Sequence, residues 1–206
     1  RLTRARGALD TVSMGVVDRE AFEASVADVV ATVRDPKLGL HGPGTISWRI
    51  SREPIVFLGG GAAALLQLAH PFVAYAVAEH SKTQTDPVGR FQRTFEYVYA
   101  IVFGDLDHAL RAARRVRLMH ERIVGTLGED AGRFRAGDPY AANDEDALLW
   151  VHATLTHTAV QVYERAVAPL DPRDKERYWQ ESKRFAGLFG LRAGRIPSTW
   201  VDFEDY

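Results

Sequence analysis

Hydrophobic residues recur every three or four positions along most of the chain, the spacing that places them on one face of a helix. The first such stretch covers residues 19–33, where Phe22, Val26 and Val29 share a face. Pro36 follows it closely, and proline does not continue a helix. The same pattern predicts further helices over residues 62–79, 87–103, 105–125, 144–167 and 173–189.

Two stretches rich in glycine, proline or aspartate separate these helices. Residues 37–54 are expected to form a loop with one short extended piece, Thr45–Ile50, and Gly128–Tyr140 is expected to be a connection. No repeat or long linker interrupts the pattern. Residues 1–206 are therefore predicted to form a single all-α globular domain with about five to six main helices.

Polar and proline residues predict where individual helices begin. Asp86 precedes Pro87, the arrangement of an N-cap residue followed by a first-turn proline. Asn143 is expected to cap the longest helix in the same way. The triplet Gly59–Gly61 could suggest a phosphate-binding loop, but no Lys-Ser/Thr pair follows it. Close packing of helices is the better interpretation of the triplet.

The longest apolar stretch, Ile55–Ala78, has the length of a membrane-spanning helix. It also contains Gln67, His70 and Pro71, so we expect a buried helix interrupted by proline instead. The basic residues 1–6 are not followed by the apolar run of a secretory signal. A cytoplasmic location is the expectation from these two observations.

Charge and cysteine content narrow the function classes. Lys and Arg number 26 against 27 Asp and Glu, a formal net charge of −1, so no overall positive field would attract nucleic acid. Cysteine is absent, which excludes disulfides, iron–sulfur clusters, zinc thiolate sites and thiolate-ligated haem. Any metal would have to be bound by histidine, carboxylate or tyrosine.

Two short basic motifs lie on consecutive predicted helices. Arg90 and Thr94 are four residues apart, and Arg117 and His120 are three apart, so each pair occupies one helix face among mostly apolar neighbours. A flat, anionic, iron-carrying cofactor such as haem needs imidazole for its iron and guanidinium for its propionates. The two motifs predict such a site.

Simpler interpretations exist for the same residues. His120 by itself would more often be a hydrogen-bonded core residue, and Arg90 and Arg93 could lie on a solvated helix face, paired with Asp86 or Glu96. The Glu-x-x-His pattern of di-iron bundles, the His-Glu-x-x-His pattern of zinc proteases and the Gly-x-Ser-x-Gly elbow of hydrolases do not occur. These three enzyme classes are therefore disfavoured.

The remaining histidines have structural explanations. His70 is expected to satisfy a backbone carbonyl that Pro71 leaves without an N–H donor, and His80 is expected to cap the carbonyls of a helix end. His152 and His157 are five residues apart, about 140° around a helix, so they should not converge on one ion.

Taken in order, these motifs resemble the rubber-oxygenase family, which includes the latex clearing proteins and a related oxygenase of the mycophenolic-acid pathway. The resemblance covers about residues 40–206. The further segments that match in order are Pro43–Arg49, Gly59–Gly61, Leu66–Pro71, Glu79–Ser81, Phe103–Gly104, Tyr140–Ala142, Leu149–Thr154 and Tyr178–Trp179.

The resemblance implies an all-α, globin-reminiscent domain that binds haem b, with His120 as the proximal iron ligand. It also implies that Arg90, Thr94 and Arg117 line the haem pocket and serve catalysis. The latex clearing proteins have a lysine at the position of Arg93, and arginine is a poor iron ligand because it stays protonated. An open or water-filled distal side is therefore expected.

The implied activity is that of a haem-dependent oxygenase using O2 on an unidentified hydrophobic small molecule, with polyisoprene disfavoured by the departure at Arg93. Two alternatives stay open at the level of sequence. One is a haem-binding or sensing protein without turnover. The other is a non-catalytic helical interaction domain, in which the motif residues serve packing and capping.

Overall fold

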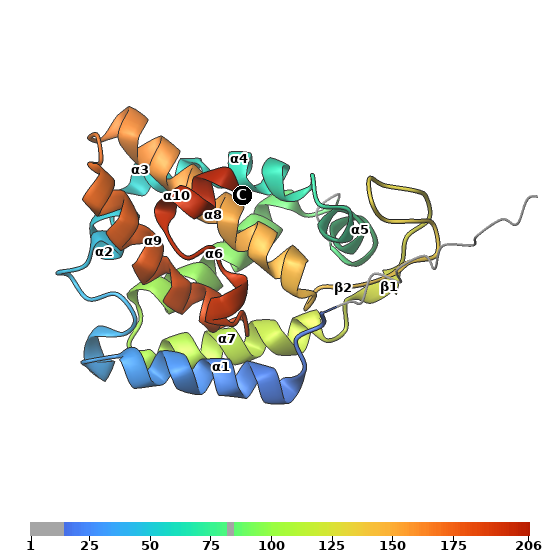
Figure 1. Ribbon diagram of the computed structural model, residues 1–206, viewed down its shortest axis with the longest axis horizontal. Helices are drawn as coiled ribbons and strands as arrows, with labels where there is room; N and C mark the ends of the chain where they lie inside the picture. Colours follow the sequence, from blue (N-terminus) through green and yellow to red (C-terminus); the bar gives the residue numbers. More distant parts are fainter. Residues whose placement is uncertain (1–14, 82–84) are drawn as a thin grey trace, which may run out of the picture.

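The computed structural model describes residues 15–81 and 85–206, so the basic N-terminal residues lie outside the described part. Within that part the chain is mostly helical with one small two-stranded sheet (Figure 1). This mostly helical structure confirms the predicted all-α class. The globin-like arrangement of the helices stays a prediction.

The described helices outnumber the five to six expected, because several short helices occupy segments predicted as loop. The elements are α1 (Arg19–Thr32), η1 (Pro36–Leu38), α2 (Ile46–Ser51), α3 (Pro54–Leu58), α4 (Gly60–Gln67), α5 (Pro71–His80), α6 (Pro87–Phe103), α7 (Leu106–His120), β1 (Val124–Thr126), β2 (Pro139–Ala141), α8 (Glu145–Ala166), α9 (Pro172–Gly187), η3 (Ala193–Arg195) and α10 (Trp200–Asp205).

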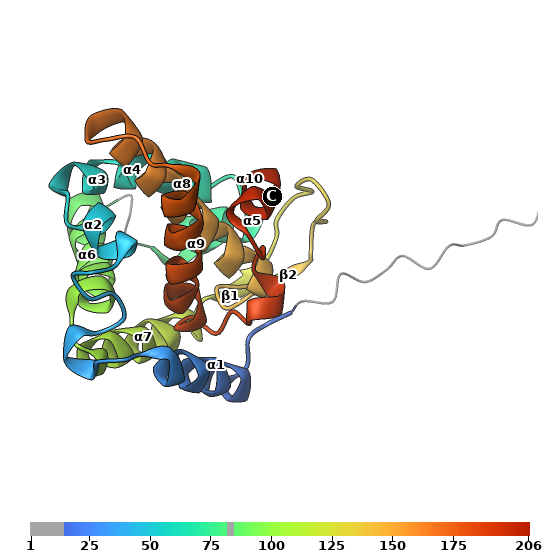
Figure 2. The same ribbon diagram turned by 60° about the vertical axis from the view of Figure 1, so that its left-hand side comes forward.

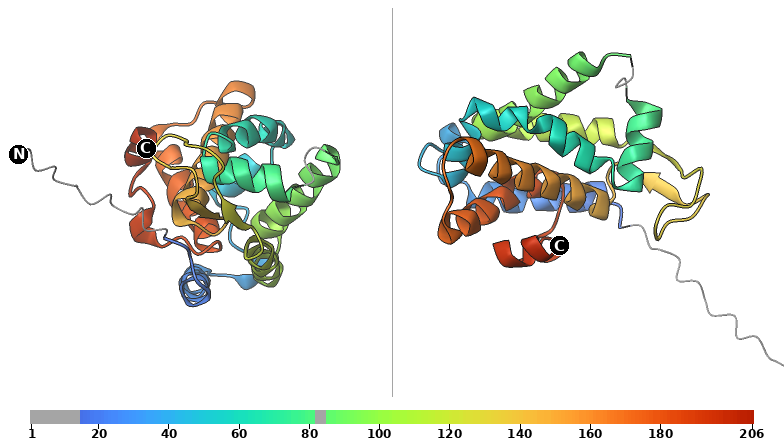
Figure 3. Two further views of the ribbon diagram at one scale, coloured as in Figure 1. Left: turned by 90° about the vertical axis from the view of Figure 1, so that its right-hand side faces the viewer. Right: turned by 90° about the horizontal axis from the view of Figure 1, so that it is seen from above.

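The long helix α8 runs through the middle of the molecule, with α9 on one side and α3 and α4 on another (Figures 1 and 2). The main core lies between these helices and α1, α6 and α7, around fully buried Trp179, Phe22 and Ile101. A smaller cluster, with Phe72 and Tyr140, joins α5 to the sheet at one end of the molecule (Figure 3). Burial of these hydrophobic side chains stabilises the fold.

The segment predicted to be extended, Thr45–Ile50, is instead largely the helix α2. Its first turn is capped twice. Thr45 Oγ1 accepts a hydrogen bond from the Trp48 N–H at 3.1 Å, and the Glu181 carboxylate accepts one from the Ser47 N–H at 2.8 Å. The second cap comes from α9, so no local sequence pattern indicates it.

The single helix predicted over residues 62–79 is in fact two, α4 and α5. The segments Pro54–Gln67 and Pro71–His80 bend by 105° relative to one another. His70 caps the second, with Nδ1 accepting a hydrogen bond from the Phe72 N–H at 3.2 Å. The predicted role of His70 toward a free carbonyl is therefore wrong: the imidazole satisfies an N–H that the helix start leaves unpaired.

The predicted burial of this apolar stretch is also only partly correct, since Leu65 is 72% exposed and Leu58 77%. Among residues 15–81 and 85–206, no single helix has both the length and the apolar composition needed to cross a membrane. The bent pair Pro54–Gln67 and Pro71–His80 passes that test only when its two parts are taken together.

The helix predicted over residues 105–125 ends earlier, at His120, and Val124–Thr126 forms strand β1. It pairs antiparallel with β2, and Gly125 lies opposite Tyr140. A Cβ at Gly125 would come within 2.7 Å of the Tyr140 ring, so glycine is needed for this close approach. His80 does not cap a helix end as predicted: its Nε2 lies 3.1 Å from Tyr140 Oη.

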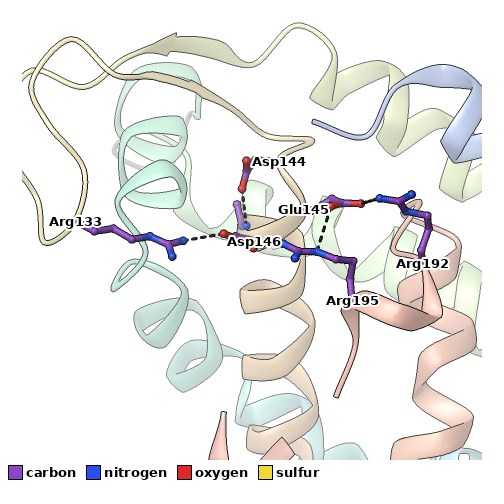
Figure 4. A network of polar contacts seen from close by, with 7 residues as sticks. Arg133, Asp144, Glu145, Asp146, Arg192 and Arg195 are labelled. Atoms are coloured by element: carbon purple, nitrogen blue, oxygen red, sulfur yellow. Dashed lines mark hydrogen bonds and ion pairs between the residues drawn. The ribbon is translucent and has the colours of Figure 1, made fainter. Parts of the chain in front are cut away.

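A network of ion pairs surrounds the N-terminus of α8 (Figure 4). Asp146 binds Arg133 and Arg195, each at 2.7 Å, and Glu145 binds Arg192 and Arg195, each at 3.2 Å. These pairs connect the start of α8 to the loop between the strands and to η3. Acidic side chains also suit the positive end of a helix dipole.

The N-cap of α8 differs from the prediction by one residue. Asp144, rather than Asn143, accepts a hydrogen bond from the Ala147 N–H, at 3.0 Å (Figure 4). Burial raises the pKa of the Asp144 carboxyl. The Asn143 side chain instead lies beside His120.

Candidate functional site

A largely apolar cavity of about 180 Å³ lies among α2, α3, α4, α6, α8 and α9. Most of its wall surface is apolar, although several polar residues also contribute to the lining. Such a lining is typical of a site for a hydrophobic small molecule. The polar residues that line it are His41, Ser47, Ser51, Gln67, Arg90, Thr94, His152, Thr156, Thr158, Tyr178 and Ser182.

Helix α6 presents one stripe of side chains to this cavity. Arg90, Thr94, Val98 and Val102 follow one another at intervals of four residues and all line it. Arg93 does not: its guanidinium binds the Asp86 carboxylate at 3.1 Å on an exposed face. The prediction that Arg90 and Thr94 share a face, with Arg93 directed elsewhere, is therefore confirmed.

The guanidinium of Arg90 is half-buried, and this burial lowers its pKa. It makes no hydrogen bond or ion pair with another described residue. Thr94 Oγ1 donates a hydrogen bond to the Arg90 carbonyl at 3.0 Å, which keeps the two residues on the same wall. A partly desolvated cation without a neighbouring carboxylate is suited to binding an anionic or strongly polar group.

The second motif lies at the end of α7, outside the lining of this cavity. Arg117 is buried: its Nη1 donates a hydrogen bond to the Val17 carbonyl at 2.7 Å, and its Nε donates one to Glu121 at 3.1 Å. Its guanidinium also lies 5.5 Å from the centre of the Phe22 ring. Arg117 therefore joins α7 to α1 and to the residues just before it.

His120 occupies a desolvated position beside Asn143. Burial lowers the pKa of His120 to about 4, while a hydrogen bond with the Asn143 side chain raises it and the Arg117 cation lowers it. The ring is therefore neutral at pH 7, and Nδ1 has no hydrogen-bond partner among the described residues. The preceding side chains, Leu118 and Met119, are 55% and 39% exposed. A neutral imidazole beside exposed apolar groups can act as a metal ligand.

The structure thus brings Arg90 and Thr94 to one wall, and places Arg117 and His120 together elsewhere. Helices α6 and α7 diverge from their short connection at Gly104 (Figure 2), and the motifs lie toward their far ends. That all four residues surround one bound group stays a prediction. In the part of the chain that the structure describes, no cluster of three or more histidine and acidic side chains is placed to hold a metal ion.

Sequence reasoning missed several polar residues of the cavity. His41 lies in a loop in which hydrophobic residues are not regularly spaced, so the local sequence did not indicate that this residue lines a cavity. His152 could have been found, because it belongs to a segment matched in the family resemblance. Its Nε2 lies 3.3 Å from Ser182 Oγ, and burial together with the Lys183 cation lowers its pKa to about 4. As predicted, His157 does not join it and is exposed on the other side of α8.

Comparison with known proteins agrees with the resemblance. The model of the family described as "ER-bound oxygenase mpaB/B'/Rubber oxygenase, catalytic domain" matches residues 48–206. The uncharacterised proteins Mb2261 of Mycobacterium bovis and Rv2237 of Mycobacterium tuberculosis are each 28% identical over 151 residues, which is 70% of this chain and 56% of theirs. The chain therefore spans about half the length of these relatives. No solved structure matches.

Proposed function

The chain belongs to the mpaB/B' and rubber oxygenase catalytic-domain family, and from this premise we propose that it is a haem b-dependent oxygenase acting with O2 on a hydrophobic small molecule. The observation that supports the substrate class is the cavity beside α6. Its apolar wall would bind the body of the substrate and exclude water from it.

In this proposal, residues of α6 orient the bound molecule. The half-buried Arg90 cation lies at the wall without an acidic partner in the described chain, so it is available for an anionic group of the cofactor or for a polar group of the substrate. Thr94 holds the first turns of α6 through its hydrogen bond to the Arg90 carbonyl. Both residues are proposed to act in catalysis through this positioning.

His120 fits the role of axial ligand to haem iron. Its imidazole is neutral at pH 7, and its buried Nδ1 makes no hydrogen bond with a described residue. A bound haem would supply the binding and activation of O2 and would need only one protein ligand of this kind. Arg117 would hold the end of α7 so that His120 keeps its orientation, and its predicted contact with haem is retained as part of this proposal.

The absorption spectrum of protein supplied with haem tests the cofactor assignment. We expect His120→Ala to lose most of its bound haem. His157→Ala, which changes an exposed histidine of α8, should keep the wild-type content. Equal haem content in wild type and His120→Ala, at equal folding by circular dichroism, would show that His120 is not the ligand.

Turnover requires a separate measurement. Haem-replete protein is incubated with O2, a reductant and candidate lipids or terpenoids, and products are detected by mass spectrometry. Oxygenated product that disappears in Arg90→Ala would support the proposed enzyme. Stoichiometric haem without any product would instead favour binding or sensing.

A further inference from the structure

Three residues that line the apolar cavity each carry a buried polar atom without a hydrogen-bond partner among the described residues. His41 Nδ1, Ser47 Oγ and Thr158 Oγ1 make no hydrogen bond with any described residue. The three residues are only 3%, 3% and 6% exposed, and all three line the cavity. Leaving one such group unsatisfied costs about 1–3 kcal/mol, so three at one cavity indicate a ligand with matching polar groups.

Ser47 lies away from Arg90. The stripe of α6 from Arg90 to Val102 spans about 18 Å at the rise of an α-helix. The C-terminal end of α6 lies beside α2, because the rings of Trp48 and Phe103 are 5.1 Å apart. Ser47, next to Trp48, therefore belongs to the end of the cavity opposite Arg90.

The polar atoms also come from several elements. Ser47 is in the first turn of α2, and His41 lies in the loop before it, near Arg184 of α9. Thr158 belongs to α8, where its methyl group packs closely against Gly59. The hydroxyl oxygen of the same side chain is buried and has no hydrogen-bond partner among the described residues.

The two histidines that line the cavity are uncharged at neutral pH. Burial and the Arg184 cation lower the pKa of His41 to about 4, and burial lowers that of His152 to about 4. The carboxylate of Glu181 accepts hydrogen bonds from the N–H groups that begin α2. A neutral hydroxyl or carbonyl oxygen fits these three uncharged partners better than a carboxylate, because uncharged groups do not offset the cost of desolvating a negative charge.

We propose that His41, Ser47 and Thr158 form a polar subsite that binds the hydroxyl or carbonyl oxygen of an otherwise apolar ligand. The ligand is then an oxygen-bearing hydrophobic molecule rather than a plain hydrocarbon. A cavity of about 180 Å³ has room for a body the size of a substituted benzene ring. That this ligand is the substrate rests on the proposed oxygenase function, whereas its binding does not.

A pair of small ligands with equal numbers of heavy atoms tests the subsite. Benzyl alcohol and ethylbenzene differ mainly in the hydroxyl group, and their affinities can be compared by isothermal titration calorimetry. Wild-type protein should prefer benzyl alcohol. In the double variant Ser47→Ala, Thr158→Val that preference should fall by about tenfold, the effect of losing one or two hydrogen bonds.

A stability measurement adds a signature that a purely structural role would not produce. Replacing unpaired buried hydroxyls by apolar groups of similar shape should raise the Tm of the double variant while its preference for benzyl alcohol falls. Thr154→Val is the matched control on α8. Its hydroxyl donates a hydrogen bond to the Val151 carbonyl and lies outside the cavity lining, so the ligand preference should not change.

The proposal is overturned if neither ligand binds, or if wild type and double variant show the same preference, which would mean that water satisfies these groups. Haem content is measured on the same preparations. Normal haem with no ligand preference would reject the subsite alone. A clear preference without haem would reject the proposed oxygenase and leave the subsite standing.

Discussion

The guanidinium of Arg117 shows how one buried charge is accommodated at the residue scale. It is 9% exposed, yet it donates hydrogen bonds to the Val17 carbonyl and to Glu121 and packs over the Phe22 ring. A buried cation is tolerated only when its donors are satisfied in this way. Arg117 is therefore a link between α7 and α1, whatever it contributes to a cofactor.

Replacing Arg117 by alanine should lower the free energy of unfolding by about 1.5–3 kcal/mol, the range for hydrogen bonds that involve a charged group. Arg117→Lys should recover only part of this, because an ammonium lacks the planar fork that reaches both partners. Urea denaturation measures both. Arg115→Ala, an exposed arginine on the same helix, is the control and should change little. Unchanged stability with reduced haem affinity would instead assign Arg117 to the cofactor alone.

At the scale of elements, the short helix α2 depends on another helix for its existence. Six residues are too few to form a stable helix in isolation. Its N–H groups at Ile46 and Ser47 donate to Glu181 of α9, at 3.4 and 2.8 Å. A carboxylate at this position also interacts favourably with the positive end of the helix dipole.

Removal of this carboxylate in Glu181→Ala should lower the free energy of unfolding by about 1–2 kcal/mol, the usual effect of losing an N-terminal cap. Glu181→Gln keeps one acceptor oxygen and should lower the free energy of unfolding by less. Because α2 carries Ser47, the alanine variant should also bind benzyl alcohol more weakly. Glu129→Ala removes an exposed carboxylate from the connection between the strands and serves as the control. Equal urea midpoints for all these variants would contradict the capping role.

At the scale of the whole molecule, buried neutral histidines couple stability to pH. Burial lowers the pKa of His41 and of His152 to about 4, well below the unperturbed value of about 6.5. Arg184 near the first and Lys183 near the second disfavour protonation further. Between these pKa values the unfolded chain binds more protons than the folded one, so stability falls as pH decreases from about 6.5 to about 4.

Each of these histidines should contribute up to about 1.4 kcal/mol per pH unit to this slope. Urea unfolding between pH 7 and pH 4.5 measures it. His152→Gln should flatten the curve by about that amount, since glutamine does not titrate. His157→Gln, at an exposed position, should leave the slope as in the wild type. An identical slope in wild type and His152→Gln would show that His152 is not the titrating group.

Much of the helical structure could be predicted because its causes are local. Helix α6 begins at Pro87 behind the Asp86 cap, as expected, since a capping side chain and the N–H that it binds are three residues apart. The periodicity of α8 and α9 likewise depends only on neighbours one turn away. The order of short motifs along the chain was also sufficient to indicate the family.

What the sequence could not determine depends on contacts between distant segments. The cap of α2 joins residues 134 positions apart, and the break between α4 and α5 puts two apolar runs at a steep angle that hydropathy alone does not reveal. The cavity also depends on contacts between segments that are distant in the sequence. Its polar subsite draws on His41, Ser47 and Thr158 from separate elements, so only tertiary packing creates it. Packing likewise brings the helix face shared by Arg90 and Thr94 to the cavity wall. It also holds Arg117 against the residues before α1, because a side chain's neighbours on other helices are set by the arrangement of whole helices.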